Sequence, residues 1–304
     1  MSLNSSTVLM VPPASFQFNP ETAASNTFQS ETHIIDADIK ALNEFNAMVL
    51  NLREHGIQVL ILKQNKLLPD AVFPNNWFST HVDAEGNNIL MIYPMLAPNR
   101  QAEVNISGLT KVFSDAHIKV NKLIDLRNNE NNILEGTGSL VLDRDNQLIY
   151  AALSARTSPI MVNTVAGILN YKPIVFNSVD EHFHPVYHTN VILSITRNYV
   201  IVCLESIKDS LQKSVLLHSF KITRKTVIEI TYEQTRHMCG NVLELFNSNG
   251  KSLLILSSQA KQHFNEHQLE TMQHFSELVP VDIETIETIG GGSARCMMAE
   301  ILFK

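Results

Sequence analysis

Apolar and polar positions along this chain follow one short pattern that returns five times. In each case a polar or glycine-rich turn leads into a run of apolar residues, which is typical of a buried β-strand after a tight turn. The five stretches cover residues 73–78, 135–142, 187–193, 238–245 and 293–298. The positions just before the strands are 76, 138, 190, 241 and 295, so the steps are 62, 52, 51 and 54 residues. A nearly constant step of this size predicts a repeat architecture.

The remainder of each repeat also follows a shared order. After the first strand come hairpin-turn residues and a second apolar strand, as at residues 148–153 and 253–256. A helical stretch follows, which is clearest at residues 258–278 with Ser258 as the candidate N-cap. A last strand ends the unit, as at residues 173–176 and 227–230. The pattern therefore predicts a strand–strand–helix–strand unit.

The two ends of the chain together supply one unit. The last repeat holds one strand, predicted over residues 297–303, and residues 7–11 form another apolar strand. A helix is predicted over residues 36–56, from Asp36 to Gly56, before a closing strand at residues 57–62. Its expected apolar face comprises Ile39, Leu42, Phe45, Val49 and Leu52. We therefore expect one domain over residues 1–304 whose shared fifth unit closes a ring; the alternative is an open sheet of ordinary α/β units.

Composition narrows the class of protein. The chain has 304 residues, 44% of them apolar, and a net charge of −7, which suits a large core and gives no basic surface for nucleic acid. Apolar runs fall short of the roughly 20 residues of a membrane span, and the N-terminus has no signal-peptide pattern. Three widely spaced cysteines do not predict a disulfide framework. We expect Cys203 in the core and the protein in a reducing cytoplasm.

Closure of a ring would bring the turns before the five strands together at its centre. These turns carry a thiol, an imidazole, a carboxylate and several amides, on Asn76, Glu135, His188, Asn190, Asn241 and Cys296. Arg295 directly precedes Cys296, and a cation beside a thiol favours the nucleophilic thiolate. The structural alternative is a buried free thiol at a tight turn.

These motifs resemble those of the pentein superfamily, which contains amidinotransferases, arginine deiminases and dimethylargininases. Residues 135–138 (Glu-Gly-Thr-Gly) are similar to the family's Glu-Gly-Gly-Asp element, and residues 188–190 (His-Thr-Asn) are similar to its His-x-Asp element. Cys296 lies where the family places its nucleophile, near the C-terminus. Three further segments look like those that hold the substrate in dimethylargininases, at residues 70–76, 98–103 and 153–157. The runs Phe-Pro-Asn-Asn-Trp and Gly-Gly-Gly-Ser-x-Arg-Cys resemble bacterial citrulline-utilisation hydrolases most closely.

The resemblance implies a five-bladed α/β propeller, with its units around a pseudo-fivefold axis, and a hydrolase that needs neither cofactor nor metal. Cys296 would attack the central carbon of a urea or amidine, a poor electrophile that a covalent route cleaves in two easier steps. His188 would protonate the departing nitrogen and then activate water, while Glu135 holds the imidazole or a substrate N–H. Arg100 and Arg156 would bind the substrate carboxylate.

Two asparagines set this chain apart from penteins that bind guanidinium groups through carboxylates. The chain has Asn76 and Asn190 there, and neutral amides both donate and accept hydrogen bonds. They suit a neutral ureido group better than a cation, so we expect citrulline as the substrate, with ornithine, ammonia and carbon dioxide as products. Asp70 is a further expected substrate ligand, and Asp70 or Glu244 keeps arginine and methylated arginine open as alternatives.

Other functions stay open at this point. An amidinotransferase would use an amine in place of water, and a non-catalytic propeller would bind a partner. A zinc site is an alternative for the histidine run His182, His184 and His188, because imidazole binds zinc well. A closed site needs four ligands, however, and near this run only Glu181 could be the fourth, so we expect solvated loop histidines. The expected partner is a small amino acid, not nucleic acid or a membrane, and a homodimer stays open.

Overall fold

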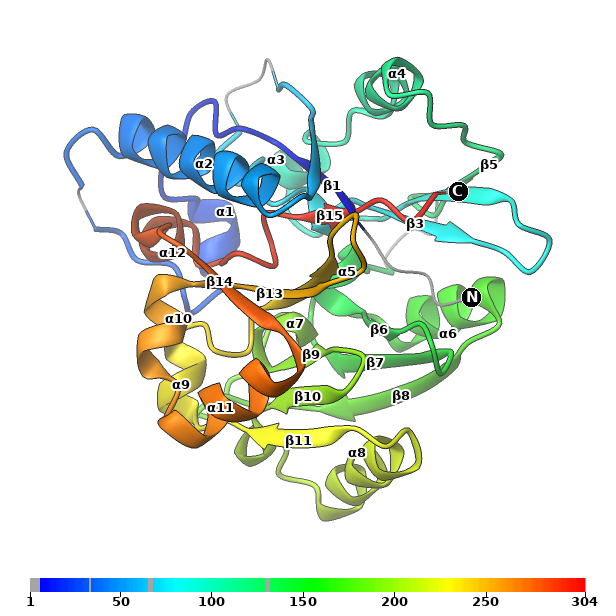
Figure 1. Cartoon of the computed structure of the whole chain (residues 1–304), viewed down its shortest axis with the longest axis vertical. Helices are drawn as coiled ribbons and strands as arrows, with labels where there is room; N and C mark the ends of the chain where they lie inside the picture. The colour runs from blue at the N-terminus through cyan, green and yellow to red at the C-terminus, as the bar shows by residue number, and fades with distance from the viewer. Residues whose placement is uncertain (1–5, 33, 65–67, 129–131, 304) are drawn as a thin grey trace.

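A computed structural model describes residues 6–32, 34–64, 68–128 and 132–303. Within these residues the strands form five three-stranded sheets in a mixed α/β fold (Figure 1). In each sheet the central strand pairs antiparallel with one neighbour and parallel with the other. A parallel pair needs a crossover connection, and helices supply it in every unit.

Four of the sheets are built from consecutive segments of the chain. They are β3 (Phe78–Val82), β4 (Asn88–Ile92) and β5 (Lys122–Asp125); β6 (Val141–Asp143), β7 (Leu148–Leu153) and β8 (Lys172–Asn177); β9 (Leu193–Ile195), β10 (Tyr199–Val202) and β11 (Thr226–Glu229); and β12 (Leu243–Phe246), β13 (Ser252–Ser257) and β14 (Glu277–Val281). The main crossover helices are α4 (Ile106–Asp115), α6 (Pro159–Leu169), α8 (Ser210–Ile222), and α10 (Ser258–His263) with α11 (Glu266–Phe275). This order agrees with the predicted strand–strand–helix–strand unit.

The fifth sheet joins the two ends of the described chain. β1 (Thr7–Met10) pairs antiparallel with β15 (Ala299–Glu300) and parallel with β2 (Gln58–Ile61). Two helices, α1 (Pro20–Ala23) and α2 (Ala37–Glu54), connect β1 to β2. Thr80 of β3 links this sheet to the next one. Its hydroxyl donates to the carbonyl of Glu300 at 2.8 Å and accepts the amide of Leu302 at 2.9 Å.

A short helical turn precedes the first strand of three units and carries predicted site residues. η1 (Pro74–Asn76) leads into β3, α5 (Gly136–Ser139) into β6, and α7 (Thr189–Ile192) into β9. All three turns are buried, and α5 contacts both of the others. The remaining short helices are α3 (Pro98–Gln101), η2 (Leu204–Ser206), α9 (Tyr232–Arg236) and α12 (Glu284–Gly290). Packing of these turns against one another places distant segments side by side.

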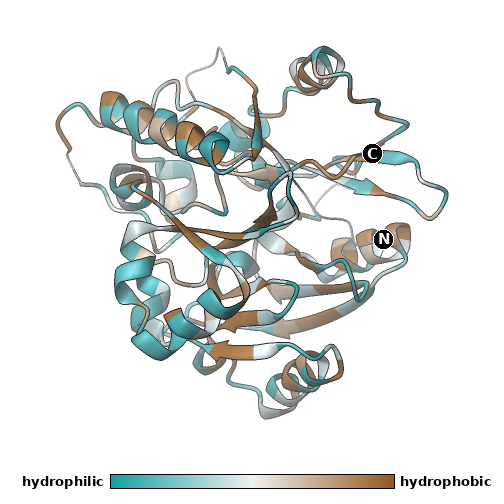
Figure 2. Ribbon diagram, in the orientation of Figure 1, coloured by the Kyte–Doolittle hydropathy of each residue, from teal (hydrophilic) through white to brown (hydrophobic). Residues whose placement is uncertain are grey.

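The central strands are the most deeply buried part of the fold. Every residue of β4 and of β10 is buried. Figure 2 shows the strands mostly in brown, whereas helices such as α10 are mostly teal. Strands covered on both faces form continuous apolar runs and do not alternate, which explains why these segments were easy to predict.

The predicted helix over residues 258–278 is wrong in its extent. It divides into α10 and α11, and Asn265 begins the second helix through a capping box with Gln268. The first helix is capped by Ser257, not by Ser258. The apolar spacing continues through the break, so this spacing alone did not show that a second helix begins at Asn265.

The face of α2 also differs from the prediction. Asp36 does occupy the N-cap position, but its φ of 57° is left-handed and its side chain makes no capping hydrogen bond. Ile39 and Leu42 are 56% and 39% exposed. The buried stripe keeps the predicted Phe45, Val49 and Leu52 and adds Ala41 and Met48.

The strand predicted over residues 297–303 is too long, since β15 comprises only two residues. The preceding residues form a tight turn, in which the amides of Cys296 and Met297 both donate to the carbonyl of Ser293. Backbone groups used inside a turn are not available to a sheet, so pairing begins only at Ala299.

The cysteines of the described chain are all unpaired. Cys203 is fully buried in the apolar interior, as predicted, and the cytoplasmic location stays a prediction. None of the helices in the described residues has the length and apolar character needed to cross a lipid bilayer.

We expect Thr80→Val to lower the free energy of unfolding by about 1–3 kcal/mol, because it removes the hydroxyl partner of the Glu300 carbonyl and of the buried Leu302 amide. Denaturant unfolding followed by the fluorescence of Trp77 measures the change. Thr110→Val is the matched control, since Thr110 is exposed on α4, and its effect should stay within about 0.5 kcal/mol. Equal losses in the two variants would contradict the linking role of Thr80.

Candidate active site

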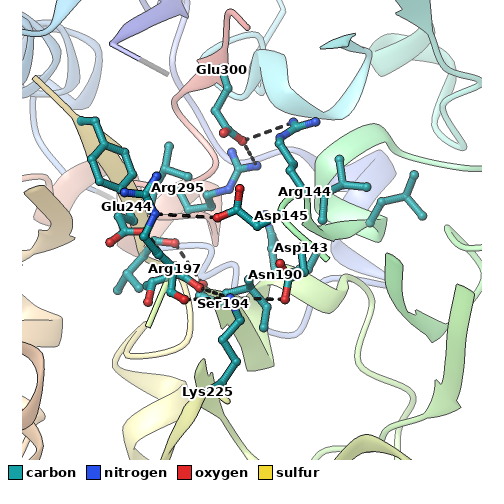
Figure 3. Close-up of a pocket in the computed structure, with 18 residues that line it drawn as sticks. Asp143, Arg144, Asp145, Asn190, Ser194, Arg197, Lys225, Glu244, Arg295 and Glu300 are labelled. Carbon is teal, nitrogen blue, oxygen red and sulfur yellow. Dashed lines mark hydrogen bonds and ion pairs between the residues drawn. The ribbon is translucent and has the colours of Figure 1, made fainter. Parts of the chain in front are cut away.

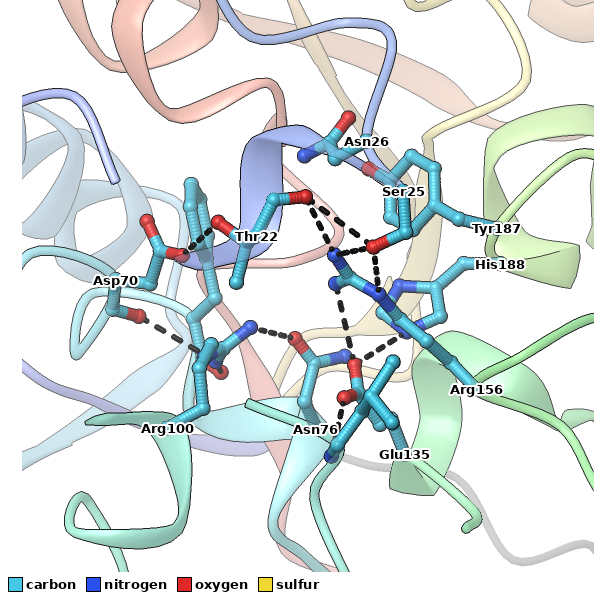
Figure 4. A network of polar contacts seen from close by, with 12 residues as sticks. Thr22, Ser25, Asn26, Asp70, Asn76, Arg100, Glu135, Arg156, Tyr187 and His188 are labelled. Carbon is cyan, nitrogen blue, oxygen red and sulfur yellow. Dashed lines mark hydrogen bonds and ion pairs between the residues drawn. The ribbon is translucent and has the colours of Figure 1, made fainter. Parts of the chain in front are cut away.

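The turns before the strands meet at one small pocket. Its lining includes six of the eight site residues predicted from the sequence, namely Asp70, Asn76, Arg100, Arg156, His188 and Cys296. The other two touch members of this set directly, since Glu135 contacts His188 and Asn190 contacts Cys296. The structure therefore brings all eight together, and Figure 4 shows the polar network on the side of His188.

The thiol of Cys296 receives hydrogen bonds from two side-chain amides. Nδ2 of Asn241 lies 3.2 Å from the sulfur, and Nδ2 of Asn190 lies 3.5 Å from it. The backbone is fixed as well, because the amide of Cys296 donates to the carbonyl of Ser293 at 2.9 Å. The third and fourth turns of the repeat thus hold the sulfur in place from two sides.

Asn241 was not among the predicted site residues, although its turn was expected at the centre. Its amide also donates to the backbone carbonyl of Asn190 at 3.0 Å. The repeat in the sequence already predicts that Asn241 lies at the centre, although it assigns no role to it. Asn241 holds the position in the fourth turn that Asn190 holds in the third, and equivalent positions of a repeat face the same centre.

Arg295 directly precedes Cys296, which suggested that its cation would face the thiol, but other groups engage its guanidinium. Its guanidinium donates to the carbonyl of Met298 at 2.9 Å and to the carboxylate of Glu300 at 3.3 Å. It lines a separate polar cavity (Figure 3). The groups that donate to the sulfur are therefore neutral amides.

This second cavity is lined by charged side chains that pair with one another (Figure 3). Lys225 and Asp143 lie 3.3 Å apart and are each only 2% exposed. Glu244 belongs to this cavity, where its carboxylate accepts the amide of Arg197 and the hydroxyl of Ser252, each at 2.7 Å. Glu244 thus lines this cavity and not the pocket of the thiol, so Asp70 is the better placed of the two alternative ligands for a guanidinium group.

A carboxylate holds the imidazole of the site in place. Nε2 of His188 lies 2.8 Å from Oε2 of Glu135, and both side chains are buried. Oε1 of Glu135 accepts the amide of Leu96 at 3.0 Å, and Oε2 lies 3.4 Å from a guanidinium nitrogen of Arg156. Burial alone would raise the pKa of Glu135, but Arg156 and the hydrogen bond from His188 hold it well below its usual value. Glu135 is therefore ionised.

The imidazole of His188 is neutral at pH 7. Burial lowers its pKa to about 4, although Glu135 favours the charged form. An ionised carboxylate only accepts hydrogen bonds, so Nε2 carries the proton of the neutral ring and Nδ1 keeps a lone pair. Gly138 provides space for the ring, since a Cβ atom there would lie 2.7 Å from Nδ1. The site thus contains a neutral base whose protonated form has a carboxylate beside it.

Arg100 fixes the orientation of the Asn76 amide. Its guanidinium makes two bonds of 2.9 Å to Glu103 and donates to Oδ1 of Asn76 at 3.0 Å. Because a guanidinium only donates, the oxygen of the amide must face it, and Nδ2 faces elsewhere. This Nδ2 is buried and has no hydrogen-bond partner among the described residues. An unpaired donor in a pocket wall indicates a ligand with an acceptor atom.

Arg156 is also held by protein groups (Figure 4). Its guanidinium donates to the hydroxyl of Ser25 at 2.6 and 3.1 Å and to the carbonyl of Thr22 at 3.1 Å, and it lies over the ring of Tyr187. A substrate carboxylate would have to share the donors of both arginines. In the structure they organise the pocket walls, and carboxylate binding by Arg100 and Arg156 stays a prediction.

An N-terminal segment that the sequence did not reveal covers part of the pocket (Figure 4). Asn26 lines the pocket, and Asn19 and Thr22 donate to Oδ2 of Asp70 at 2.7 and 3.1 Å. Oδ1 of Asp70 has no partner among the described residues, and burial raises the pKa of this carboxyl. Short polar residues occur in many loops, so this segment offered no specific motif.

The histidine run splits between the surface and the interior. The side chains of His182 and His184 are 72% and 66% exposed, whereas that of His188 is buried against Glu135. In the part of the chain that the structure describes, no three histidine, cysteine, aspartate or glutamate side chains gather as metal ligands. The zinc alternative for this run therefore lacks a converging ligand set.

We expect the protein to lose stability because of His188 as the pH falls from 6.5 toward 4. The unfolded histidine takes up a proton near pH 6.5, whereas the native one stays neutral down to about pH 4, so the unfolded state binds more protons in this window. The contribution amounts to about 2 kcal/mol between pH 7 and pH 5. Denaturant unfolding at both pH values measures it.

The matched variant for this measurement is His188→Gln, which does not titrate and keeps an N–H donor toward Glu135. The wild-type protein should lose about 2 kcal/mol more than this variant over the same interval. Parallel pH curves for the two proteins would contradict the neutral state assigned to His188.

Comparison with solved structures shows the same fold. The N-terminal domain of ArgZ, an arginine dihydrolase from the ornithine–ammonia cycle in cyanobacteria, is known as a cysteine-to-serine variant bound to substrate. It matches with a TM-score of 0.74 at 16% identity, covering 98% of both chains. Unliganded AgrE gives 0.72 at 17% identity, over 97% of this chain and 39% of AgrE. DDAH from Pseudomonas aeruginosa, in complex with citrulline, gives 0.66 at 16% identity, over 98% of this chain and 100% of that one.

A comparison with curated proteins finds no match. A family model described as N,N dimethylarginine dimethylhydrolase, eukaryotic, matches residues 12–303. The mixed α/β fold and the pentein resemblance predicted from the sequence are thus confirmed. The chain belongs to the N,N-dimethylarginine dimethylhydrolase family, a family of pentein enzymes that hydrolyse carbon–nitrogen bonds.

Proposed function

We propose that this protein is a cysteine-dependent hydrolase of an amino acid with a ureido or amidino group, and that citrulline is its preferred substrate. The observation that carries the proposal is the convergence of Cys296 and His188 on one pocket, with Glu135 behind the imidazole. Two structures with this fold involve related compounds, since ArgZ is an arginine dihydrolase and the DDAH complex contains citrulline.

The first half of the reaction forms a covalent adduct. The thiol proton of Cys296 passes to neutral His188, and the thiolate attacks the ureido carbon. The imidazolium that results is stabilised by Glu135, 2.8 Å away. It returns the proton to the leaving nitrogen as the carbon–nitrogen bond breaks, so ammonia departs and a carbamoyl group stays on the sulfur.

The second half releases the sulfur. Neutral His188 takes a proton from a water molecule, and the hydroxide adds to the carbamoyl carbon. The carbon–sulfur bond then breaks, and the thiolate recovers its proton from the imidazolium. The product is a carbamic acid, which loses carbon dioxide to give ornithine. Cys296, His188 and Glu135 all return to their starting states.

Unpaired amide atoms support a neutral ureido substrate. Nδ2 of Asn76 is a buried donor without a partner among the described residues, and Oδ1 of Asn190 and of Asn241 are buried acceptors without one. A ureido group has one carbonyl acceptor and several N–H donors, which matches this set. A guanidinium group has no acceptor for the nitrogen of Asn76 and carries a charge that these amides do not neutralise.

A second candidate function is hydrolysis of arginine or a methylated arginine. The observation in its favour is Asp70, whose buried Oδ1 has no partner among the described residues and whose side chain lines the pocket. A carboxylate there would accept from a guanidinium group with a charge-assisted bond. An amidinotransferase would share the first half-reaction and differ only in the acceptor of the second.

We also propose that the five sheets are the blades of one closed propeller, with the pocket at its centre and the whole chain as one domain. The shared strand order of the sheets and the pairing of β1 with β15 support this arrangement. A homodimer and a cytoplasmic location stay predictions.

We expect Cys296→Ala to lower ornithine release from citrulline by roughly 10⁴-fold or more, because the adduct no longer forms. Cys239→Ala is the matched control. Cys239 is a second buried cysteine, its thiol points to the carbonyl of Ala260, and its loss should leave turnover intact. Product analysis with citrulline, arginine, methylated arginines and agmatine side by side, with and without an added amine, provides the measurement.

Two outcomes of this assay would change the proposal. Turnover by Cys296→Ala near the wild-type rate would contradict the covalent route. Products that form only when an amine is added would favour the amidinotransferase.

We expect Asn190→Asp to raise the arginine-to-citrulline ratio of kcat/KM by about 10-fold to 100-fold, because a carboxylate favours a guanidinium group through charge-assisted hydrogen bonds. Both rates should fall, since the new side chain no longer donates to the sulfur of Cys296. The complementary variant is Asp70→Asn, which should weaken arginine use and spare citrulline. Unchanged ratios in both variants would contradict the proposed basis of substrate choice.

A further inference from the structure

A buried carboxyl group lies next to the nucleophile turn and takes no part in the reaction above. Glu287 belongs to α12 and is 3% exposed, whereas Glu284, one turn earlier on the same helix, is exposed. This helix (dark red in Figure 1) contacts α2, and Gln259 links it to α10. Burial of a carboxyl group costs free energy unless hydrogen bonds satisfy its oxygens, so its partners are informative.

Two different segments satisfy the oxygens of Glu287. Oε1 accepts a hydrogen bond from the hydroxyl of Ser293, and Oε2 accepts Nε2 of Gln259 at 3.0 Å. Gln259 is itself held by His237, whose Nδ1 lies 2.8 Å from its Oε1. Burial raises the pKa of Glu287 to about 7, although hydrogen bonds from Ser293, Ser257 and Gln259 favour the charged form.

Ser293 connects this carboxyl group to the thiol. Its carbonyl accepts the amides of Cys296 at 2.9 Å and of Met297 at 3.3 Å, so Ser293 starts the turn that presents the sulfur. The backbone carbonyl of Glu287 also accepts the amide of Gly291 at 2.9 Å, and Gly291 has a left-handed φ of 63°. Glu287 therefore holds both ends of residues 291–293, which lie between α12 and the thiol.

We propose that Glu287 is a positioning residue for Cys296 and acts through Ser293. The inference rests on the proposed role of Cys296 as the nucleophile. Glu287 is not part of the pocket lining, so it acts on where the sulfur lies relative to His188 and not on the substrate. A displacement of about 1 Å at a reacting atom lowers a rate by about 10²-fold.

Three other ionisable groups face Glu287 or its partner. The carboxylate of Glu44 on α2 accepts two backbone amides at the start of α12 and raises the pKa of Glu287 further. The pKa of the Cys239 thiol is raised by burial and by Glu287. His237 reaches Glu287 only through Gln259. None of these three side chains lines the pocket, so a change at Glu287 reaches the thiol through Ser293.

The test replaces the carboxyl group by an amide of the same shape. In Glu287→Gln, the amide oxygen can accept from only one of the two donors, Gln259 and Ser293, and the N–H₂ group meets the other, so the bond that Ser293 donates in the wild-type protein is lost or reversed. We expect kcat to fall by about 10-fold to 100-fold with KM changed by less than about twofold. The rate of Cys296 alkylation by iodoacetamide, followed on the labelled peptide, should fall in parallel.

Three further variants complete the design. Glu284→Gln removes an exposed carboxyl group from the same helix and should leave kcat and alkylation unchanged. Ser293→Ala should reproduce the loss seen in Glu287→Gln, because it removes the other member of the contact. Ser293→Thr keeps the hydroxyl and should recover most of the activity.

Alkylation is measured without substrate, so the inference and the proposed function can fail separately. Wild-type kcat and wild-type alkylation in Glu287→Gln overturn the inference. If Glu287→Gln does not fold, Ser293→Ala decides in the same two assays, and wild-type values there overturn the inference too. Absence of turnover in the wild-type protein, with alkylation lost in Glu287→Gln, supports the positioning role and counts against the proposed substrates only.

Discussion

The buried negative charge of Glu135 is the constraint on which the rest of the pocket depends. A carboxylate in the interior is costly unless several donors surround it. Here the donors come from distant parts of the chain, namely the amide of Leu96, the imidazole of His188 and the guanidinium of Arg156. Satisfying one charge therefore requires three segments to meet. The same charge orients the imidazole of His188 and stabilises its protonated form.

Neutral amides, in contrast, dominate the surroundings of the sulfur. Asn190 and Asn241 donate to Cys296, and their oxygens have no partners among the described residues. The guanidinium groups of Arg100 and Arg156 line the same pocket as the thiol, and each is engaged by protein acceptors. The pocket thus combines neutral amides at the sulfur with arginines that are already paired in its walls. The proposed choice of a neutral ureido substrate depends on this arrangement more than on any single residue.

The repeat register explains which parts of the structure were predictable from the sequence. Strands such as β7 and β8 and the convergence of Glu135, His188 and Cys296 follow from equivalent positions in successive units. The covering segment with Asn19 and Thr22 follows no such register, because it belongs to an irregular connection in one unit. Asn265 was missed for a different reason: a local cap interrupts a helix whose apolar spacing continues.

Side-chain partners were less predictable than positions. Arg100 and Arg156 were correctly located near the substrate site, but their engagement by Glu103 and Ser25 depends on tertiary contacts that no sequence spacing encodes. Likewise, adjacency in the sequence suggested that Arg295 would face the thiol. Neighbouring residues of a turn point in different directions, and Arg295 faces Glu300.

The pairing of Val8 with Glu300 has a consequence for how the protein folds. Four of the sheets need only contacts within one stretch of chain, whereas the fifth needs the two most distant stretches to find each other, which is entropically slow. Cys296 lies just before that last strand. We therefore expect Cys296 to reach its place beside Asn190 and Asn241 late in folding, so that chains in which β1 and β15 have not yet paired lack the assembled pocket.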